Sequence, residues 1–147
     1  MTRRYAEGTT VAAEKSRMEV DRFLQKRGAK SFATMNNEDL FAIQFQIDKR
    51  TVRIVVPRAV QAKRGDAAQR KRQADAEDRR RWRALLLVLR SKFEAIASGI
   101  TTFDREFMAH LVTASGQTVG DVLEPNLEHS LTSEAPTFLA LPPGRPT

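Results

Sequence analysis

Side chains that could contact phosphate groups are concentrated in the middle of this 147-residue chain. Residues 58–92 contain twelve Lys or Arg and four acids, for a net charge of +8, whereas residues 1–57 carry +4 and residues 93–147 carry −5. Basic side chains spaced along a helix can follow a nucleic-acid backbone and release its counterions. The residues predicted to make such contacts are Lys63, Arg64, Arg70, Lys71, Arg72, Arg79, Arg80, Arg81 and Arg83.

The same basic segment has two other interpretations. It could bind a protein with an acidic surface, or it could be a solvated helix in which Glu77 and Asp78 pair with neighbouring arginines. We favour nucleic acid, because the net charge is high and residues 66–81 contain no large apolar side chain. This stretch is therefore expected to project into solvent or to lie on a partner. DNA is expected as the partner more than RNA.

Two further features could contribute to binding but are expected to serve the fold. Trp82, the only tryptophan, could stack on a base, yet it is in register with Leu85 and Leu89 and is predicted to pack in the core. A predicted hairpin would present a polar face, which we expect to be solvated, formed by Gln44, Gln46, Thr51 and Arg53.

Residues suited to catalysis or metal binding are sparse. The chain has no cysteine, which excludes disulfides, thiolate catalysis and cysteine-ligated metal sites. His110 and His129 are far apart and have no acids at metal-ligand spacing, and Glu124 and Glu128 are expected on a solvated face. No glycine-rich phosphate loop or Gly-x-Ser-x-Gly motif is present. We therefore predict a protein that is not an enzyme and uses no metal or cofactor.

The composition also bears on location. The longest apolar run, Ala84–Leu89, is far shorter than the roughly twenty residues that a membrane span needs. The first residues are charged and have no apolar stretch behind them, which does not fit a signal peptide. A chain without cysteine is at home in a reducing compartment. The sequence thus predicts a soluble, cytoplasmic protein that makes no membrane contact.

The first half of the chain is expected to form a helix and three strands. Apolar residues at helical spacing indicate an amphipathic helix over residues 10–27, capped by Thr9 or Thr10 and ended by Gly28.

Alternating apolar and polar residues predict strands over 41–48 and 51–56, with Pro57 ending the second. The tight connection at Asp48-Lys49-Arg50 makes this pair an antiparallel hairpin. A weaker strand and a polar turn precede it, over 31–34 and 35–39.

A long helix is predicted over residues 66–97. Its first half consists of good helix formers. Its second half carries an apolar stripe that Leu87 and Val88 widen, so this half should be well buried before Ser98 and Gly99 end the helix. The stripe is formed by Trp82, Leu85, Leu86, Leu89, Phe93 and Ile96.

Two short helices are expected in the C-terminal part. Thr101 with Asp104, and Thr118 with Asp121, resemble capping boxes at the starts of these helices. The helices should cover 103–112 and 119–131, the second interrupted by Pro125.

These elements indicate an α+β fold in which the amphipathic and long helices pack on a small antiparallel three-stranded sheet. A single domain should span residues 1–132, and the Pro-rich residues 133–147 should form a flexible tail. The exposed edges of so small a sheet could pair in a homodimer. The predicted core is Val20, Phe23, Leu24, Phe41, Ile43, Phe45, Ile54, Leu85, Leu86, Leu89, Phe93, Phe103 and Phe107.

Several stretches resemble a family of small uncharacterised proteins encoded by bacteriophages and prophages. They are Tyr5–Thr10, Glu14–Arg17, Arg81–Val88, Gly99–Val112 and Thr118–Gly120. The resemblance implies a phage or prophage origin, the cytoplasm of a bacterial host, and a context of DNA metabolism or interference with host defence. Separately, the order of helix, three strands and helix resembles the double-stranded-RNA-binding domain, at the level of fold only.

The sequence therefore predicts a non-enzymatic nucleic-acid-binding protein that contacts phosphates through a basic helix, in phage replication or recombination. Two alternatives stay open. The chain could be an interaction module that binds or inhibits a host protein, or a minor structural subunit of the virion. The acidic residues 113–147 could fold back on the basic helix and mask it.

Overall fold

The computed structural model describes residues 3–58 and 63–131, with side chains from Glu14 onward except at Ser130. The predicted tail, 133–147, lies outside the described residues. Helices pack against a three-stranded sheet whose strands are antiparallel and follow chain order, which confirms the α+β class. The elements are α1 (Arg3–Lys26), β1 (Lys30–Asn36), β2 (Leu40–Ile47), β3 (Arg50–Pro57), α2 (Ala67–Ala97), α3 (Phe103–Phe107), η1 (Met108–His110), α4 (Val119–Leu123), η2 (Glu124–Asn126) and α5 (Leu127–Ser130).

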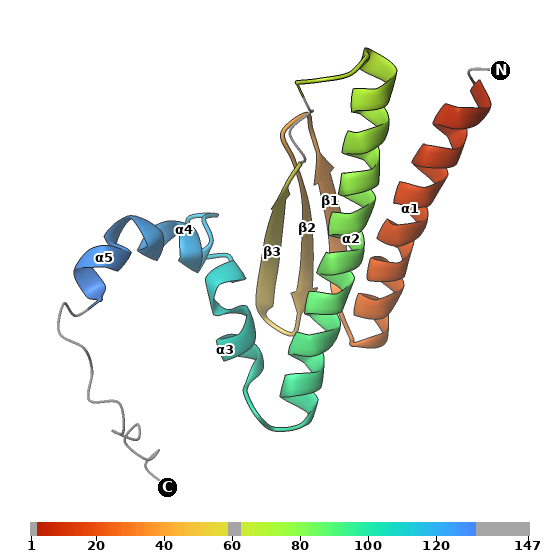
Figure 1. Cartoon of the computed structure of the whole chain (residues 1–147). Helices are drawn as coiled ribbons and strands as arrows, with labels where there is room; N and C mark the ends of the chain where they lie inside the picture. The colour runs from red at the N-terminus through yellow and green to blue at the C-terminus, as the bar shows by residue number, and fades with distance from the viewer. Residues whose placement is uncertain (1–2, 59–62, 132–147) are drawn as a thin grey trace, which may run out of the picture.

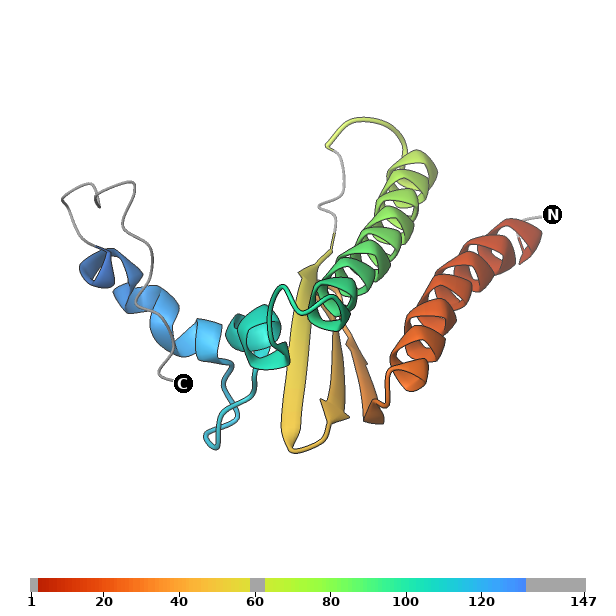
Figure 2. The same cartoon turned by 90° about the horizontal axis from the view of Figure 1, so that it is seen from below.

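Two long helices form one layer and the sheet forms the other. α1 and α2 lie side by side over one face of the sheet, and no described helix covers the opposite face (Figures 1 and 2). α3 and η1 lie beside β3, and α4 and α5 extend away from the two-layer body (Figure 1). The predicted order of helix, three strands and helix is therefore correct.

The β2–β3 hairpin closes where the sequence predicts. Ile47 pairs with Arg50 across a two-residue connection, in which Asp48 adopts a positive φ of 51°. Aspartate tolerates this left-handed conformation better than most residues. Val52 and Ile54 face the helices and are buried, as the alternation predicts.

Strand β1 is longer than the predicted 31–34. It includes Met35 and Asn36, which we expected in the turn, because the turn needs only residues 37–39. The Asn37 side chain stabilises that turn, since its Oδ1 accepts the N–H groups of Asp39 and Leu40 at 2.9 and 2.8 Å. The side chain of one asparagine thus replaces the longer polar loop.

Helix α1 begins at Arg3 rather than at residue 10, so Thr9 and Thr10 do not cap it. The glycine at position 8 does not stop the helix, because a single interior glycine costs only about 1 kcal/mol. The other end is as predicted. Gly28 has a φ of 87°, and the N–H of Ala29 bonds the carbonyl of Leu24 at 3.0 Å.

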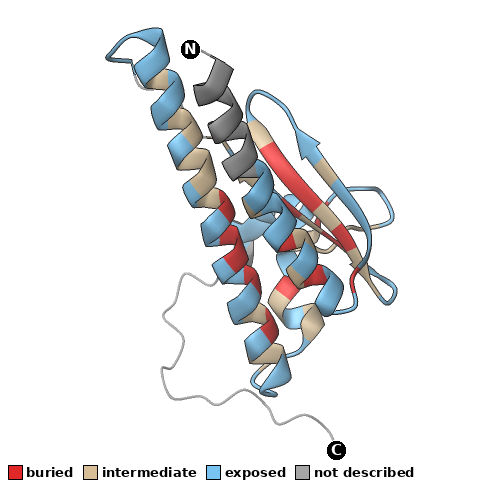
Figure 3. Ribbon diagram, turned by 90° about the vertical axis from the view of Figure 1, so that its right-hand side faces the viewer, coloured by how far each residue is buried: buried red, intermediate tan, exposed pale blue. Residues whose placement is uncertain are grey.

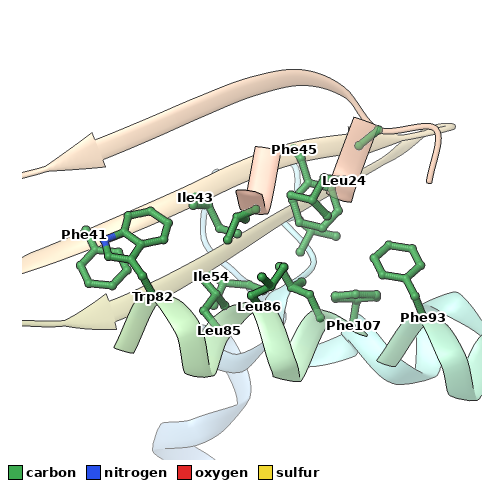
Figure 4. Close-up of a cluster of buried hydrophobic side chains, with 14 residues drawn as sticks. Leu24, Phe41, Ile43, Phe45, Ile54, Trp82, Leu85, Leu86, Phe93 and Phe107 are labelled. Carbon is green, nitrogen blue, oxygen red and sulfur yellow. The ribbon is translucent and has the colours of Figure 1, made fainter. Parts of the chain in front are cut away.

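The core lies between the two helices and the sheet, where the buried residues of α2 face those of β2 and β3 (Figure 3). The rings of Trp82 and Phe41 stack with centroids 4.3 Å apart and an interplanar angle of 11°, as Figure 4 shows. Trp82 is therefore a core residue, as expected. The predicted core is buried except for Phe23 and Phe103, which are partly exposed, and it omits Val52, which is fully buried.

Leu87 and Val88 contradict the prediction that they widen the buried stripe. Their exposed fractions are 62% and 48%. Residues step by about 100° around a helix, so Leu87 lies about 180° and Val88 about 80° from the line midway between Leu85 and Leu89. Because the sheet covers only one side of α2, an apolar pair on the other side stays in solvent.

The C-terminal helices differ from the prediction in their ends. Thr102, not Thr101, caps α3 by accepting the N–H of Arg105 at 3.4 Å. The helical run ends at His110 instead of 112, because Val112 turns away to bond the Thr51 carbonyl at 2.8 Å.

The second predicted capping box is confirmed. The N–H of Asp121 bonds the Thr118 hydroxyl at 3.1 Å, and the Asp121 carboxylate accepts the N–H of Thr118 at 3.2 Å. Pro125 lies in the short turn η2 and separates α4 from α5, as expected. In the described part of the chain, no helix is both long and apolar enough to cross a membrane.

We predict that Trp82→Ala lowers the free energy of unfolding by about 3–5 kcal/mol, because it removes the ring that stacks on Phe41 and leaves a cavity. Leu87→Ala, on the exposed side of the same helix, should change it by less than about 0.5 kcal/mol. Denaturant titration followed by circular dichroism measures both. Similar losses in the two variants would contradict this division of α2.

Candidate nucleic-acid interface

The basic helix α2 begins at a well-defined cap. The Asp66 carboxylate accepts the N–H of Gln69 at 2.8 Å, and the Gln69 amide oxygen accepts the N–H of Asp66 at 3.4 Å. Gly65, just before the cap, has a φ of 100°, which favours glycine. This cap places the basic connection at the N-terminal end of the helix.

Cations gather at that end of the molecule. Lys63 and Arg64 are exposed beside the cap, and Lys71 and Arg72 are exposed in the first turns of α2. Arg70, between them, is half-buried. The unpaired N–H groups of a helix N-terminus add partial positive charge. These predicted residues therefore form one positive end of the protein.

Arg80 and Arg81 share an acidic partner. Glu77 contacts Arg80 at 3.1 Å and Arg81 at 3.5 Å. Arg81 also donates to the main-chain carbonyl of Pro57, at the end of β3. Arg81 therefore holds α2 against the sheet, and both side chains are less available to an outside anion than their sequence position suggests.

A second charged contact joins α2 to the sheet at the same level. Arg58, which follows β3, lies 3.8 Å from the Asp78 carboxylate and donates to the Asn36 side chain at 2.6 Å. Its N–H bonds the carbonyl of Asp39 at 2.8 Å. The pairing of Glu77 and Asp78 with arginines, which was one interpretation of the basic segment, is thus correct for these residues.

Four arginines lie along one flank of α2. Residues 72, 79, 83 and 90 are separated by seven, four and seven positions, which places them within about 40° of each other around the helix. Lys92 and Arg81 lie on the opposite flank, where they contact α3 and β3. We call Arg72, Arg79, Arg83 and Arg90 the arginine stripe.

The arginine stripe is on the flank of α2 that faces α1. α1 lies on the other side of α2 from β3 (Figure 1), and Phe23 of α1 contacts Phe93 with ring centroids 5.7 Å apart. Arg72, Arg83 and Arg90 are exposed and Arg79 is half-buried. The stripe extends over about 27 Å, since each residue rises about 1.5 Å.

Pairing separates three arginines of the stripe from Arg80 and Arg81. Within the described residues, Arg79, Arg83 and Arg90 make no hydrogen bond or ion pair with another side chain. Arg90 was not among the predicted binding residues. The sequence signal for Arg90 was its spacing of seven residues from Arg83, which places both on the same flank of a helix.

The other two candidate binding features, Trp82 and the polar face of the hairpin, make contacts within the protein. Trp82 is buried, so it is not available to stack on a base. On the hairpin, Arg53 donates to the Gln44 side chain at 3.0 Å and to the Gly116 carbonyl at 2.8 Å. This arginine ties the sheet to the turn before α4, and the predicted polar face is only partly solvated.

A shallow pocket of about 360 Å³ lies at the closed end of the hairpin. Arg50 and Asp104 border it and form a two-pronged ion pair, with Nε–Oδ1 and Nη2–Oδ2 distances of 2.8 and 2.9 Å. The hydrogen bond from Arg50 lowers the pKa of Asp104. In residues 3–58 and 63–131, no three His, Cys, Asp or Glu side chains are placed to hold a metal ion.

The acidic C-terminal residues do not cover the arginine stripe where they are described. α4 and α5 extend from the β3 side of the sheet, opposite to α1 (Figure 1). The masking suggested by the sequence is therefore not made by residues 113–131 of the same chain, and residues 132–147 lie outside the described part.

The chain matches no protein-family model, and no curated protein or solved structure is significantly similar to it. The resemblance to phage and prophage proteins consequently stays a prediction.

We predict that His110 makes stability depend on pH. Burial, and then the nearby Lys92, lower the pKa of His110 below its usual value of 6.5, against a hydrogen bond to the Arg53 main chain that raises it. The unfolded chain therefore binds a proton first as the pH falls. The contribution of His110 to the free energy of unfolding is therefore fully present above pH 6.5. It is lost as the pH falls through the lowered pKa of the folded state.

His110→Gln should flatten the dependence of unfolding free energy on pH below neutrality, measured by denaturant titration at several pH values. His129→Gln is the matched control, since His129 is exposed. An NMR titration that gives His110 a pKa at or above 6.5 would contradict the prediction.

Proposed function

We propose that this protein is a non-enzymatic nucleic-acid-binding protein and that α2 makes its phosphate contacts. The arginine stripe carries the proposal. It presents four cations along about 27 Å of a single helix flank, and the three at 79, 83 and 90 have no paired acid among the described residues. Such a line of cations matches the repeating negative charge of a nucleic-acid backbone.

The positive end of α2 supports the same proposal. Lys63, Arg64 and Lys71 are exposed around the helix N-terminus, where the partial positive charge of the helix also favours an anion. A backbone that follows the stripe toward this end would meet further cations. The contacts are to phosphate, so we expect affinity with little dependence on base sequence.

The ion pairs rank the predicted residues. Arg80 and Arg81 share Glu77, and Arg81 is engaged with Pro57, so both are expected to contribute less than Arg83 and Arg90. The resemblance to phage and prophage proteins favours DNA over RNA and suggests a role in replication or recombination in the host cytoplasm.

Binding of labelled single- and double-stranded DNA and RNA, measured by fluorescence anisotropy across a salt series, tests the proposal. The wild-type chain should bind with a steep salt dependence. Arg83→Ala/Arg90→Ala should reduce the slope of log affinity against log salt by about 1.8 on duplex DNA, or about 1.4 on a single strand. The loss should be similar for all base sequences.

Lys49→Ala/Arg105→Ala is the matched control, because it removes the same charge from exposed positions outside α2. Its slope should stay within a few tenths of the wild-type slope. Equal effects of the two double variants would assign binding to net charge alone. Failure of the wild-type chain to bind at low salt would reject the proposal and favour an acidic protein partner.

A further inference from the structure

An apolar patch faces solvent on the outer side of α2. Leu87 and Val88 are exposed there, and the small residues Ala84 and Ser91 lie one turn before and after them. Single exposed apolar residues are common, but adjacent large ones on an otherwise polar helix face mark a contact surface. We call Ala84, Leu87, Val88 and Ser91 the outer patch.

Cations surround the outer patch. Residues 80–92 contain five Lys or Arg and no acid. By helical position, Arg80 precedes the patch on the same face, and Arg83 and Arg90 border one side of it. A partner for this surface should therefore combine apolar side chains with negative charge.

The segment 119–131, which we call the arm, has that chemistry. Leucines recur every four residues, at 123, 127 and 131, and are exposed by 55%, 48% and 63%. The arm contains three carboxylates and no Lys or Arg. From Asp121 to His129, every described residue is exposed, so the arm buries almost nothing in its own chain. Helical turns this short are not stable alone and need a surface to pack on.

The arm cannot reach the outer patch of its own chain. Thr118 pairs with Val112, and the N–H of Val119 bonds the Leu111 carbonyl at 2.9 Å. Gly120 fits closely against η1, since a Cβ there would lie 2.9 Å from the Ala109 carbonyl oxygen. These contacts hold α4 on the β3 side, so that the arm points away from α2 (Figure 1).

The edges of the sheet are poorly suited to pairing with a second copy of the chain. Val112 covers part of the β3 edge through its bond to Thr51. The β1 edge has an irregularity between Lys30 and Ala33, where Ser31 adopts a positive φ of 55°. Bulges and lysines on an edge strand discourage pairing with another chain. Edge pairing, the route to a dimer expected from the sequence, is thus disfavoured.

We propose that the arm of one copy docks on the outer patch of a second copy. The arm leucines cover Leu87 and Val88, and Glu124 and Glu128 lie among the surrounding arginines. The exchange is reciprocal, which gives a closed two-fold dimer with two identical contacts. A 13-residue arm about 10 Å wide covers roughly 200 Å². Each contact buries about this area on both partners, so the two contacts bury about 800 Å² in total, which fits a reversible dimer.

Sedimentation velocity of the full chain, from about 5 to about 500 μM without nucleic acid, tests this dimer. The wild-type chain should shift from monomer to dimer as concentration rises. Leu87→Asp and Leu127→Asp should each remain monomeric, since one removes the patch and the other the arm. Ile100→Asp, at a side chain 81% exposed outside both surfaces, should dimerise like the wild type. Circular dichroism confirms that each variant is folded.

Two outcomes overturn the proposal. One is a wild-type chain that stays monomeric throughout the range. The other is a Leu127→Asp variant that dimerises like the wild type, which would place the interface elsewhere. The experiment contains no nucleic acid, so its result is independent of the proposed function.

Crosslinking tests whether the contact is made between arm and patch. The chain has no cysteine, so single substitutions give unique thiols. Ala84→Cys in the patch and Glu128→Cys in the arm, mixed as two differently sized chains and oxidised, should form a mixed disulfide dimer. The control mixture pairs Ile100→Cys with Glu128→Cys. Equal yields from the two mixtures would contradict the docking.

Discussion

The mismatch in length between α2 and the sheet governs the rest of the structure. A helix of 31 residues is about 46 Å long, whereas strands of eight residues reach about 27 Å. Trp82 stacks on Phe41 and fixes which part of the helix lies over the sheet. Arg81 meets the end of β3 at Pro57, so the residues before it extend beyond the sheet. This part of α2 has no apolar surface to pack on, and it carries many of the basic residues.

The same helix presents three different surfaces along and around its axis. One is the buried stripe that packs on the sheet, one is the arginine stripe beside α1, and one is the outer patch in solvent. The ion pair of Arg58 with Asp78 and the hydrogen bond from Arg81 to the Pro57 carbonyl lie at the boundary between the core and the charged segment, and they join the helix to the sheet there. The arginine stripe and the outer patch are thus carried by a helix that the core anchors.

Periodicity predicted most of the fold because most elements obey a single pattern. The hairpin alternates except at Ala42, which is buried although the pattern assigns it to the polar face, and Leu85, Leu86 and Leu89 lie where a helix buries them. The prediction was wrong where exposed and buried apolar residues adjoin in sequence, and where a single side-chain hydrogen bond determines the length of a turn. Leu87 and Val88 follow the buried leucines in sequence but face outward, and one Asn37 side chain shortened the expected turn. Composition identified the basic segment that forms the first half of α2. It could not separate the paired Arg80 and Arg81 from the unpaired Arg83, because pairing depends on rotamers and on Pro57, distant in sequence.

Placing opposite charges at separate parts of the molecule gives the protein a large electric dipole. Cations collect around the N-terminal end of α2, and the carboxylates of the segment 119–131 lie on the far side of β3. In the field of a polyanion, such a molecule turns before contact, with its positive end leading. Productive encounters then become more frequent than random collision allows. Added salt would slow association before it weakens the contacts themselves, because screening acts first on long-range forces.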